Sequence, residues 1–174
     1  MNQPLVVTLT DESRQTWLDI DLGSGYQAEI AAANVLIVPE RDFRNGIKYV
    51  FFQDTINLLN FFQTELNGKL TVEICANDEE YLELALHSAT FRISKILVEV
   101  IVAPLIVDLL STYISDELKA KPTDTVELSI VIEDHDCKSF EFKYKGEAKD
   151  LNQLSDKVGQ LARDCQAKKD ASKS

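Results

Sequence analysis

The chain has few of the residues that break regular structure or cross-link a fold. Among its 174 residues are 6 glycines, 4 prolines and 3 cysteines. So little glycine and proline excludes a collagen-like or low-complexity chain. Cys75, Cys137 and Cys165 are odd in number and form no CxxC pair, which excludes a disulfide framework. We therefore expect reduced thiols in a cytoplasmic protein.

Long apolar runs are also missing. The most apolar stretch, Ile96–Val107, is interrupted by Glu99 and Pro104 and is too short to span a bilayer. We expect it to form core. Residues Met1–Leu5 contain no basic side chain, so we expect no signal peptide there.

Basic residues are scarce relative to acidic ones. The formal net charge is -11, and residues 1–90 hold five basic and fourteen acidic side chains. A negative field repels nucleic-acid phosphates and anionic lipids, so we expect neither nucleic acid nor membrane as a partner. A protein partner, or self-association, is the expectation that remains.

Signatures of catalysis and cofactor binding are absent. No glycine-rich phosphate loop and no nucleophile-elbow motif occurs, and the chain has 2 histidines. We name no catalytic residue and expect no cofactor. His135 and Cys137 are weak metal-ligand candidates, but adjacent residues of one turn cannot readily converge on an ion, so we expect no metal.

Alternating apolar residues predict hairpins separated by polar turns. We expect them over residues 17–32, 70–86 and 126–144, besides a strand at Leu5–Thr10. Helical spacing predicts three main helices near 54–66, 104–119 and 150–166. The expected fold is α+β, a largely antiparallel sheet built from hairpins with about three helices packed on one face. Residues 1–166 would form a single domain, and 167–174 a flexible polar tail.

Aromatic residues gather around the first long helix. A helix buries a stripe little more than 100° wide, so adjacent apolar residues spread beyond one stripe. Exposed aromatics mark interfaces. The interface candidates on this ground are Phe51, Phe52, Leu58, Phe61 and Phe62.

These patterns favour a non-enzymatic protein-interaction module: a small subunit, adaptor or inhibitor of a larger intracellular assembly. One alternative is an enzyme or small-ligand binder with a site scattered over loops, where Arg41, Asp42 and Arg44 are the first candidates. Another is an acidic mimic of nucleic acid that blocks a DNA-binding protein.

Overall fold

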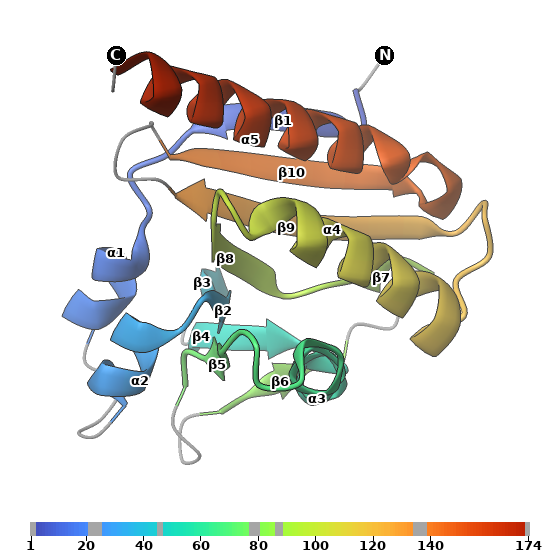
Figure 1. Cartoon of the computed structure of the whole chain (residues 1–174). Coiled ribbons are helices and arrows are strands. Elements are labelled where there is room, and N and C mark those ends of the chain that lie inside the picture. Colours follow the sequence, from blue (N-terminus) through green and yellow to red (C-terminus); the bar gives the residue numbers. More distant parts are fainter. Residues whose placement is uncertain are drawn as a thin grey trace.

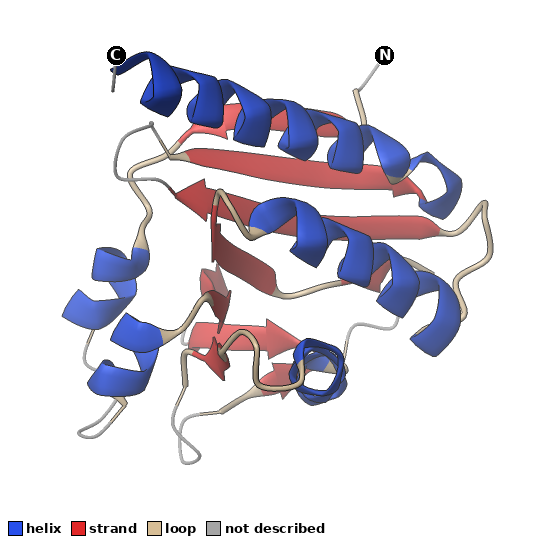
Figure 2. Ribbon diagram, in the orientation of Figure 1, coloured by secondary structure: helices blue, strands red, loops and turns tan. Residues whose placement is uncertain are grey.

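The computed structural model describes residues 3–20, 26–44, 47–76, 81–85, 89–133 and 139–172. A mixed sheet forms the middle of the molecule, and helices lie against it (Figures 1 and 2). The strands are β1 Leu5–Leu9, β2 Val35–Val38, β3 Glu40–Arg44, β4 Ile47–Phe52, β5 Val72–Ile74, β6 Glu83–Leu84, β7 Phe91–Arg92, β8 Lys95–Glu99, β9 Thr125–Glu133 and β10 Phe140–Glu147. The helices are α1 Arg14–Asp19, α2 Gln27–Ala32, α3 Thr55–Leu66, α4 Ala103–Thr112 and α5 Asn152–Ser172.

The larger, seven-stranded sheet has the order β1-β10-β9-β8-β2-β5, with β7 also paired to β9. Three neighbouring pairs are antiparallel: β1 with β10, β10 with β9, and β2 with β8. The pairs β8 with β9, β7 with β9, and β2 with β5 are parallel. The α+β class is confirmed, but the sheet is mixed, so the expectation of a largely antiparallel sheet needs correction. A smaller sheet joins β3, β4 and β6.

Only the last predicted hairpin is confirmed. β9 and β10 pair antiparallel, with Val126 opposite Gly146 and Ile132 opposite Phe140. The hairpin predicted over 70–86 is wrong, because β5 pairs with β2 and β6 pairs with β4. Those strands find partners far along the chain, which local alternation does not encode.

The hairpin predicted over 17–32 is also wrong, because this segment forms the short helices α1 and α2. Each has six residues, fewer than two helical turns, and over that length strand and helix spacing look alike. Each buries one residue, Trp17 or Ile30. Leu18 and Tyr26 are partly buried and pack against the same small core.

The three longer predicted helices are confirmed as α3, α4 and α5. Helix α4 runs on into a π-helical turn at Tyr113–Glu117, and α5 continues to Ser172, beyond the expected end at 166. α3, α4 and α5 lie on one face of the sheet, but α1 and α2 lie on the other, so the expectation of helices on a single face is corrected (Figure 1). No helix within the described ranges is both long and apolar enough to cross a bilayer.

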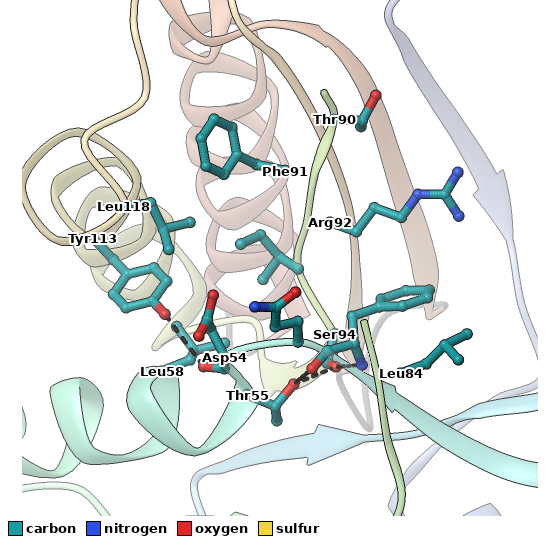
Figure 3. A pocket seen from close by; sticks show the side chains of 13 residues that line it. Asp54, Thr55, Leu58, Leu84, Thr90, Phe91, Arg92, Ser94, Tyr113 and Leu118 are labelled. Atoms are coloured by element: carbon teal, nitrogen blue, oxygen red, sulfur yellow. Dashed lines mark hydrogen bonds between the residues drawn. The ribbon is translucent and has the colours of Figure 1, made fainter. Parts of the chain in front are cut away.

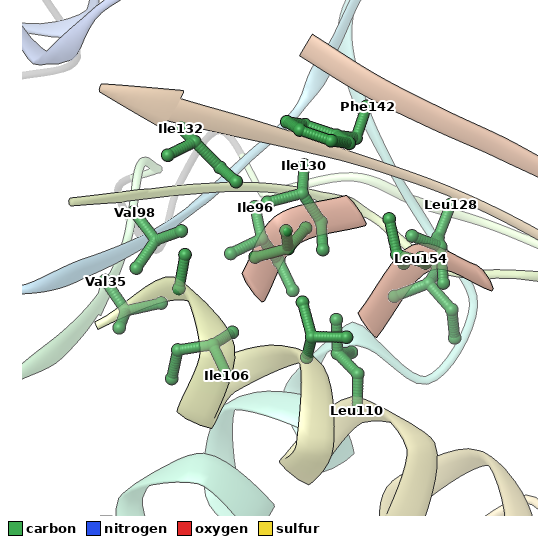
Figure 4. Packing of buried hydrophobic residues seen from close by; sticks show 14 of the residues in the cluster. Val35, Ile96, Val98, Ile106, Leu110, Leu128, Ile130, Ile132, Phe142 and Leu154 are labelled. Carbon is green, nitrogen blue, oxygen red and sulfur yellow. The ribbon is translucent and has the colours of Figure 1, made fainter. Parts of the chain in front are cut away.

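The main core lies between the sheet and α3, α4 and α5. Val35, Ile96 and Val98 of the sheet face Ile106 of α4 and Leu154 of α5 (Figure 4). Because side chains alternate across a strand, their neighbours point to the opposite face. There Leu36, Val38, Leu97 and Val131 pack beneath Trp17 and Ile30 as a smaller core.

The smaller core lies under β2, β8 and part of β9. On the rest of that face β9 and β10 present polar side chains, including Ser129, Lys143 and Lys145. One end of the sheet is therefore covered on both faces, and the β1 end on one face only. Strand β1 and the open face of β9 and β10 are therefore accessible.

Candidate functional site

Strand β1 lies at the outer edge of the larger sheet. Among the described residues its one strand partner is β10, in an unbroken register from Leu5 opposite Tyr144 to Leu9 opposite Phe140. Two backbone hydrogen bonds flank this register. Lys145 N–H donates to the carbonyl of Pro4 at 2.8 Å, and Thr10 N–H donates to the carbonyl of Ser139 at 3.1 Å.

These flanking bonds determine which way the backbone of β1 faces. In an antiparallel ladder, residues directed at one neighbour alternate with residues directed away from it. Positions 4 and 10 bond to β10, so positions 6 and 8 do so as well. Leu5, Val7 and Leu9 therefore direct their N–H and C=O groups to the open edge. This row of donors and acceptors could pair with another strand.

Three of the five side chains of β1 are apolar and exposed, and between them they lie on both faces of the sheet. Val6 has an exposed fraction of 48%, Val7 of 43% and Leu9 of 61%. Free edges are usually protected by a charge, a proline or a bulge within the strand. Leu5–Leu9 contains no charge and no proline, and its register has no bulge. Strand β1 is thus an unprotected, apolar edge.

A close backbone approach at Gly146 anchors the start of β1. A Cβ atom at Gly146 would lie 2.9 Å from Cβ of Pro4 and 2.9 Å from the hydroxyl of Tyr144. Atoms do not approach so closely, so a side chain here would displace Pro4 or Tyr144. Glycine at 146 therefore permits Pro4 and Tyr144 to pack this closely at the start of β1.

A cavity of about 210 Å³ lies where β4 meets α3 (Figure 3). Ser94 and Thr55, both buried, lie beside it. The hydroxyl of Thr55 donates to the carbonyl of Phe52 at 2.6 Å, so the hydroxyl of Ser94, 2.8 Å away, must donate to Thr55. Ser94 in turn accepts from the N–H of Phe52 at 3.0 Å.

These bonds form a closed ring through the Phe52 backbone and two hydroxyls. Within the ring Ser94 donates its proton to Thr55 and Thr55 donates to the carbonyl of Phe52, and Thr55 also forms a side-chain hydrogen bond with Tyr81. The ring explains why two polar side chains are buried here, and it gives neither hydroxyl the character of a nucleophile. It fixes the end of β4 against the segment between β7 and β8.

A groove of about 380 Å³ crosses the open face of β9 and β10. Lys95 lies between two carboxylates, 3.4 Å from Glu12 and 3.3 Å from Glu141. Arg92 Nε lies 3.6 Å from Oε2 of Glu127. These cations and carboxylates neutralise each other within the chain, so the groove is not organised around a ligand of one charge.

Neighbouring groups stabilise the carboxylate of Glu141 in its ionised form. Burial acts to raise its pKa, but the hydrogen bond from Ser129 at 2.8 Å and the ammonium groups of Lys95 and Lys143 outweigh burial and hold the pKa below its usual value. A carboxyl stabilised as the anion does not serve as a general acid near neutral pH. Its role here is to balance charge.

The residues expected at an interface lie largely in the core. Phe51, Leu58 and Phe62 are buried in the main core, and Phe52 is also buried. Phe61 is partly buried and packs on Tyr113, with ring centroids 5.3 Å apart. β4, β5 and the π-helical turn cover more of α3 than a single stripe, so the aromatics there are explained by packing within the chain.

Arg41, Asp42 and Arg44, expected in a loop, lie in strand β3, and the described side chains among them do not converge on a site. The guanidinium of Arg41 binds Glu12 at 3.3 Å and lies 5.4 Å from the Trp17 ring centroid, while Asp42 has a positive φ of 53°. Neither residue lines the two cavities above. The side chain of Arg44 lies outside the described residues.

The described residues also provide neither a cluster of metal ligands nor a reactive Cys75 thiol. Within the described ranges no group of three His, Cys, Asp or Glu side chains could hold a metal ion, and His135 and Cys137 lie outside those ranges. Burial raises the pKa of the Cys75 thiol to about 12, and Arg14 only partly opposes this effect. A thiol protonated at neutral pH is a poor nucleophile.

The interface reasoning from sequence did not single out the open edge formed by β1. The sequence of Leu5–Leu9 indicates a strand without charged residues. It does not indicate whether that strand lies at the edge or in the middle of the sheet. Comparisons with protein-family models, with curated proteins and with solved structures found no significant match.

Proposed function

We propose that this protein is a non-enzymatic interaction module, a small subunit, adaptor or inhibitor of a larger intracellular assembly, and that β1 is its contact edge. The observation that carries the proposal is the outward row of backbone groups at Leu5, Val7 and Leu9. Strand addition to a free edge is a common mode of protein recognition. The backbone provides affinity, and the exposed side chains of β1 provide selectivity.

The cavities support a binding role over an enzymatic one. The hydroxyls of Ser94 and Thr55 are hydrogen-bonded in a closed ring, and Arg92 and Lys95 of the groove form ion pairs with carboxylates of the chain. Neither site combines a nucleophile with a base. The β1 edge, in contrast, leaves both hydrogen-bonding groups and apolar surface available.

A matched pair of lysine substitutions tests the proposal. Tagged wild-type chain, Val7→Lys and Ile101→Lys are each incubated with native lysate, and the retained proteins are quantified, untagged copies of the chain included. Ile101 is 78% exposed and lies in the turn between β8 and α4, away from β1. Lysine on an edge strand discourages pairing.

We expect wild type and Ile101→Lys to retain a stoichiometric protein that Val7→Lys loses, with all three chains melting at similar temperatures. Equal retention by all three chains would show that β1 is not the contact. No retained protein at all would contradict an interaction module.

A further inference from the structure

We propose that the strand that pairs with β1 is β1 of a second copy of this chain, antiparallel and related by a two-fold axis at Val7. The inference rests on the proposed function and names its partner. Pairing about Val7 places all five residues of each strand opposite a residue of the other. Val7 then faces its own counterpart, and Leu5 faces Leu9 of the second copy.

Backbone direction agrees with this register. Leu5, Val7 and Leu9 present N–H and C=O groups outward. Pairing Leu5 with Leu9, and Val7 with Val7, matches outward-facing residues with outward-facing residues in both copies. Each such pair exchanges two hydrogen bonds. A shift by one position would place outward-facing residues opposite inward-facing ones, so it is excluded.

The side-chain pairs that this register creates are also favourable. A two-fold axis perpendicular to the sheet keeps each face on its own side, so Val7 meets Val7, and Leu5 meets Leu9, on the face that carries α5. On the opposite face Val6 meets Thr8. Apolar and β-branched pairs directly across strands are favourable, and no like charges oppose each other.

Charge repulsion between two copies is low at this end of the molecule. Strand β1 has no charged residue, β10 has two of each sign, and α5 has four basic and three acidic residues. These three elements together carry about +1, whereas the whole chain carries -11. A two-fold contact through β1 therefore joins two nearly neutral ends and leaves most of the negative charge away from the contact.

The size of the contact sets its strength. Pairing of two five-residue strands buries less surface than the roughly 1,200 Å² of a standard stable interface. We therefore expect a reversible dimer with a Kd of roughly 1–100 μM. Sedimentation should give a mass near 19.6 kDa in dilute solution and approach twice that value as concentration rises.

Val7→Pro tests the backbone pairing. Proline removes the N–H of Val7, which faces outward, and leaves the bonds of β1 to β10 in place, as edge strands tolerate. We expect dimerisation to weaken by at least about tenfold while the melting temperature of the monomer is kept. An unchanged dimer would overturn the proposal.

A cysteine pair tests the register without disturbing the fold. In a Cys137→Ser background, leaving the buried Cys75 and Cys165, either Val7→Cys or Leu9→Cys is introduced and the chain is treated with oxidised glutathione. In the proposed register two Val7 positions are about 5.5 Å apart between Cα atoms, within disulfide range. Two Leu9 positions are separated by four residues along the strands, roughly 14 Å, which is beyond it.

We expect rapid cross-linking of Val7→Cys and little of Leu9→Cys, although Leu9 is the more exposed. Equal cross-linking of both would indicate random collision and overturn the proposal. A chain that stays monomeric at about 500 μM would also overturn it. If that monomer still captured another protein through Val7, the proposed function would stand and the second copy would be the wrong partner.

Discussion

The carboxylate of Glu133 accepts two hydrogen bonds from Arg14, one from the backbone N–H at 3.0 Å and one from Nε at 3.4 Å. Arg14 also donates from Nη1 to the carbonyl of Ala31 at 2.7 Å, next to the end of α2. One side chain thus joins α1, α2 and the end of β9.

Replacing Arg14 with leucine should therefore loosen the small core as well as remove charge. Glu133 and the carbonyl of Ala31 lose charged hydrogen bonds, and the net contribution of such a bond is roughly 1.5–3 kcal/mol. We expect Arg14→Leu to lower the free energy of unfolding by about 2 kcal/mol in urea denaturation. Arg163→Leu, on the exposed face of α5, should change it by less than about 0.5 kcal/mol. Equal effects would show that the Arg14 contacts are not stabilising.

Ser94→Ala should open the hydroxyl ring. The N–H of Phe52 loses its acceptor, and Thr55 loses its donor, in a buried position. Leaving such groups unpaired costs about 1–3 kcal/mol, which we expect as a loss of unfolding free energy. Ser111→Ala is the control, since Ser111 bonds to the carbonyl of Val107 within α4 and that carbonyl keeps its helical surroundings. A neutral Ser94→Ala would mean that water replaces the missing hydroxyl.

Two glycine-to-alanine substitutions should change the free energy of unfolding in opposite directions. Gly146→Ala forces a contact of 2.9 Å with Pro4 and Tyr144, so we expect a loss of about 1–3 kcal/mol. Gly159 lies within α5, where a Cβ meets only the guanidinium of Arg163 at 3.4 Å. Alanine favours helix over glycine, so Gly159→Ala should stabilise by about 0.5–1 kcal/mol. Thermal denaturation measures both, and a stabilising Gly146→Ala would contradict the close approach.

The ion pair of Glu141 should make the free energy of unfolding depend on pH in the acid range. Its folded-state pKa is lowered from 4.5, so its stabilising effect is complete well above that value and is lost as pH falls through the folded pKa. We expect the difference in unfolding free energy between wild type and Glu141→Gln to shrink between about pH 6 and about pH 3. A difference that stays constant or grows over that range would show that the carboxylate is not held as the anion.

Some elements could be predicted from the sequence because their information is local. The apolar stripe of α5 and the proline at the start of α4 fix those helices within their own residues. The β9–β10 hairpin likewise needs only alternation and a turn between adjacent strands. The hairpin predicted over 17–32 is wrong because helices of six residues are too short to separate helical from strand periodicity.

The sequence by itself determined the α+β class, the three long helices, the last hairpin and the acidity of the chain. Only the tertiary structure decided that β8 lies parallel to β9, that α1 and α2 cover the second face, and that β1 is at the edge. It also placed Phe51 and Phe62 in the core and left Val6, Val7 and Leu9 exposed. The physical reason is that burial depends on which distant segments cover a residue, and an apolar strand reads the same whether it lies in the middle of a sheet or at its edge.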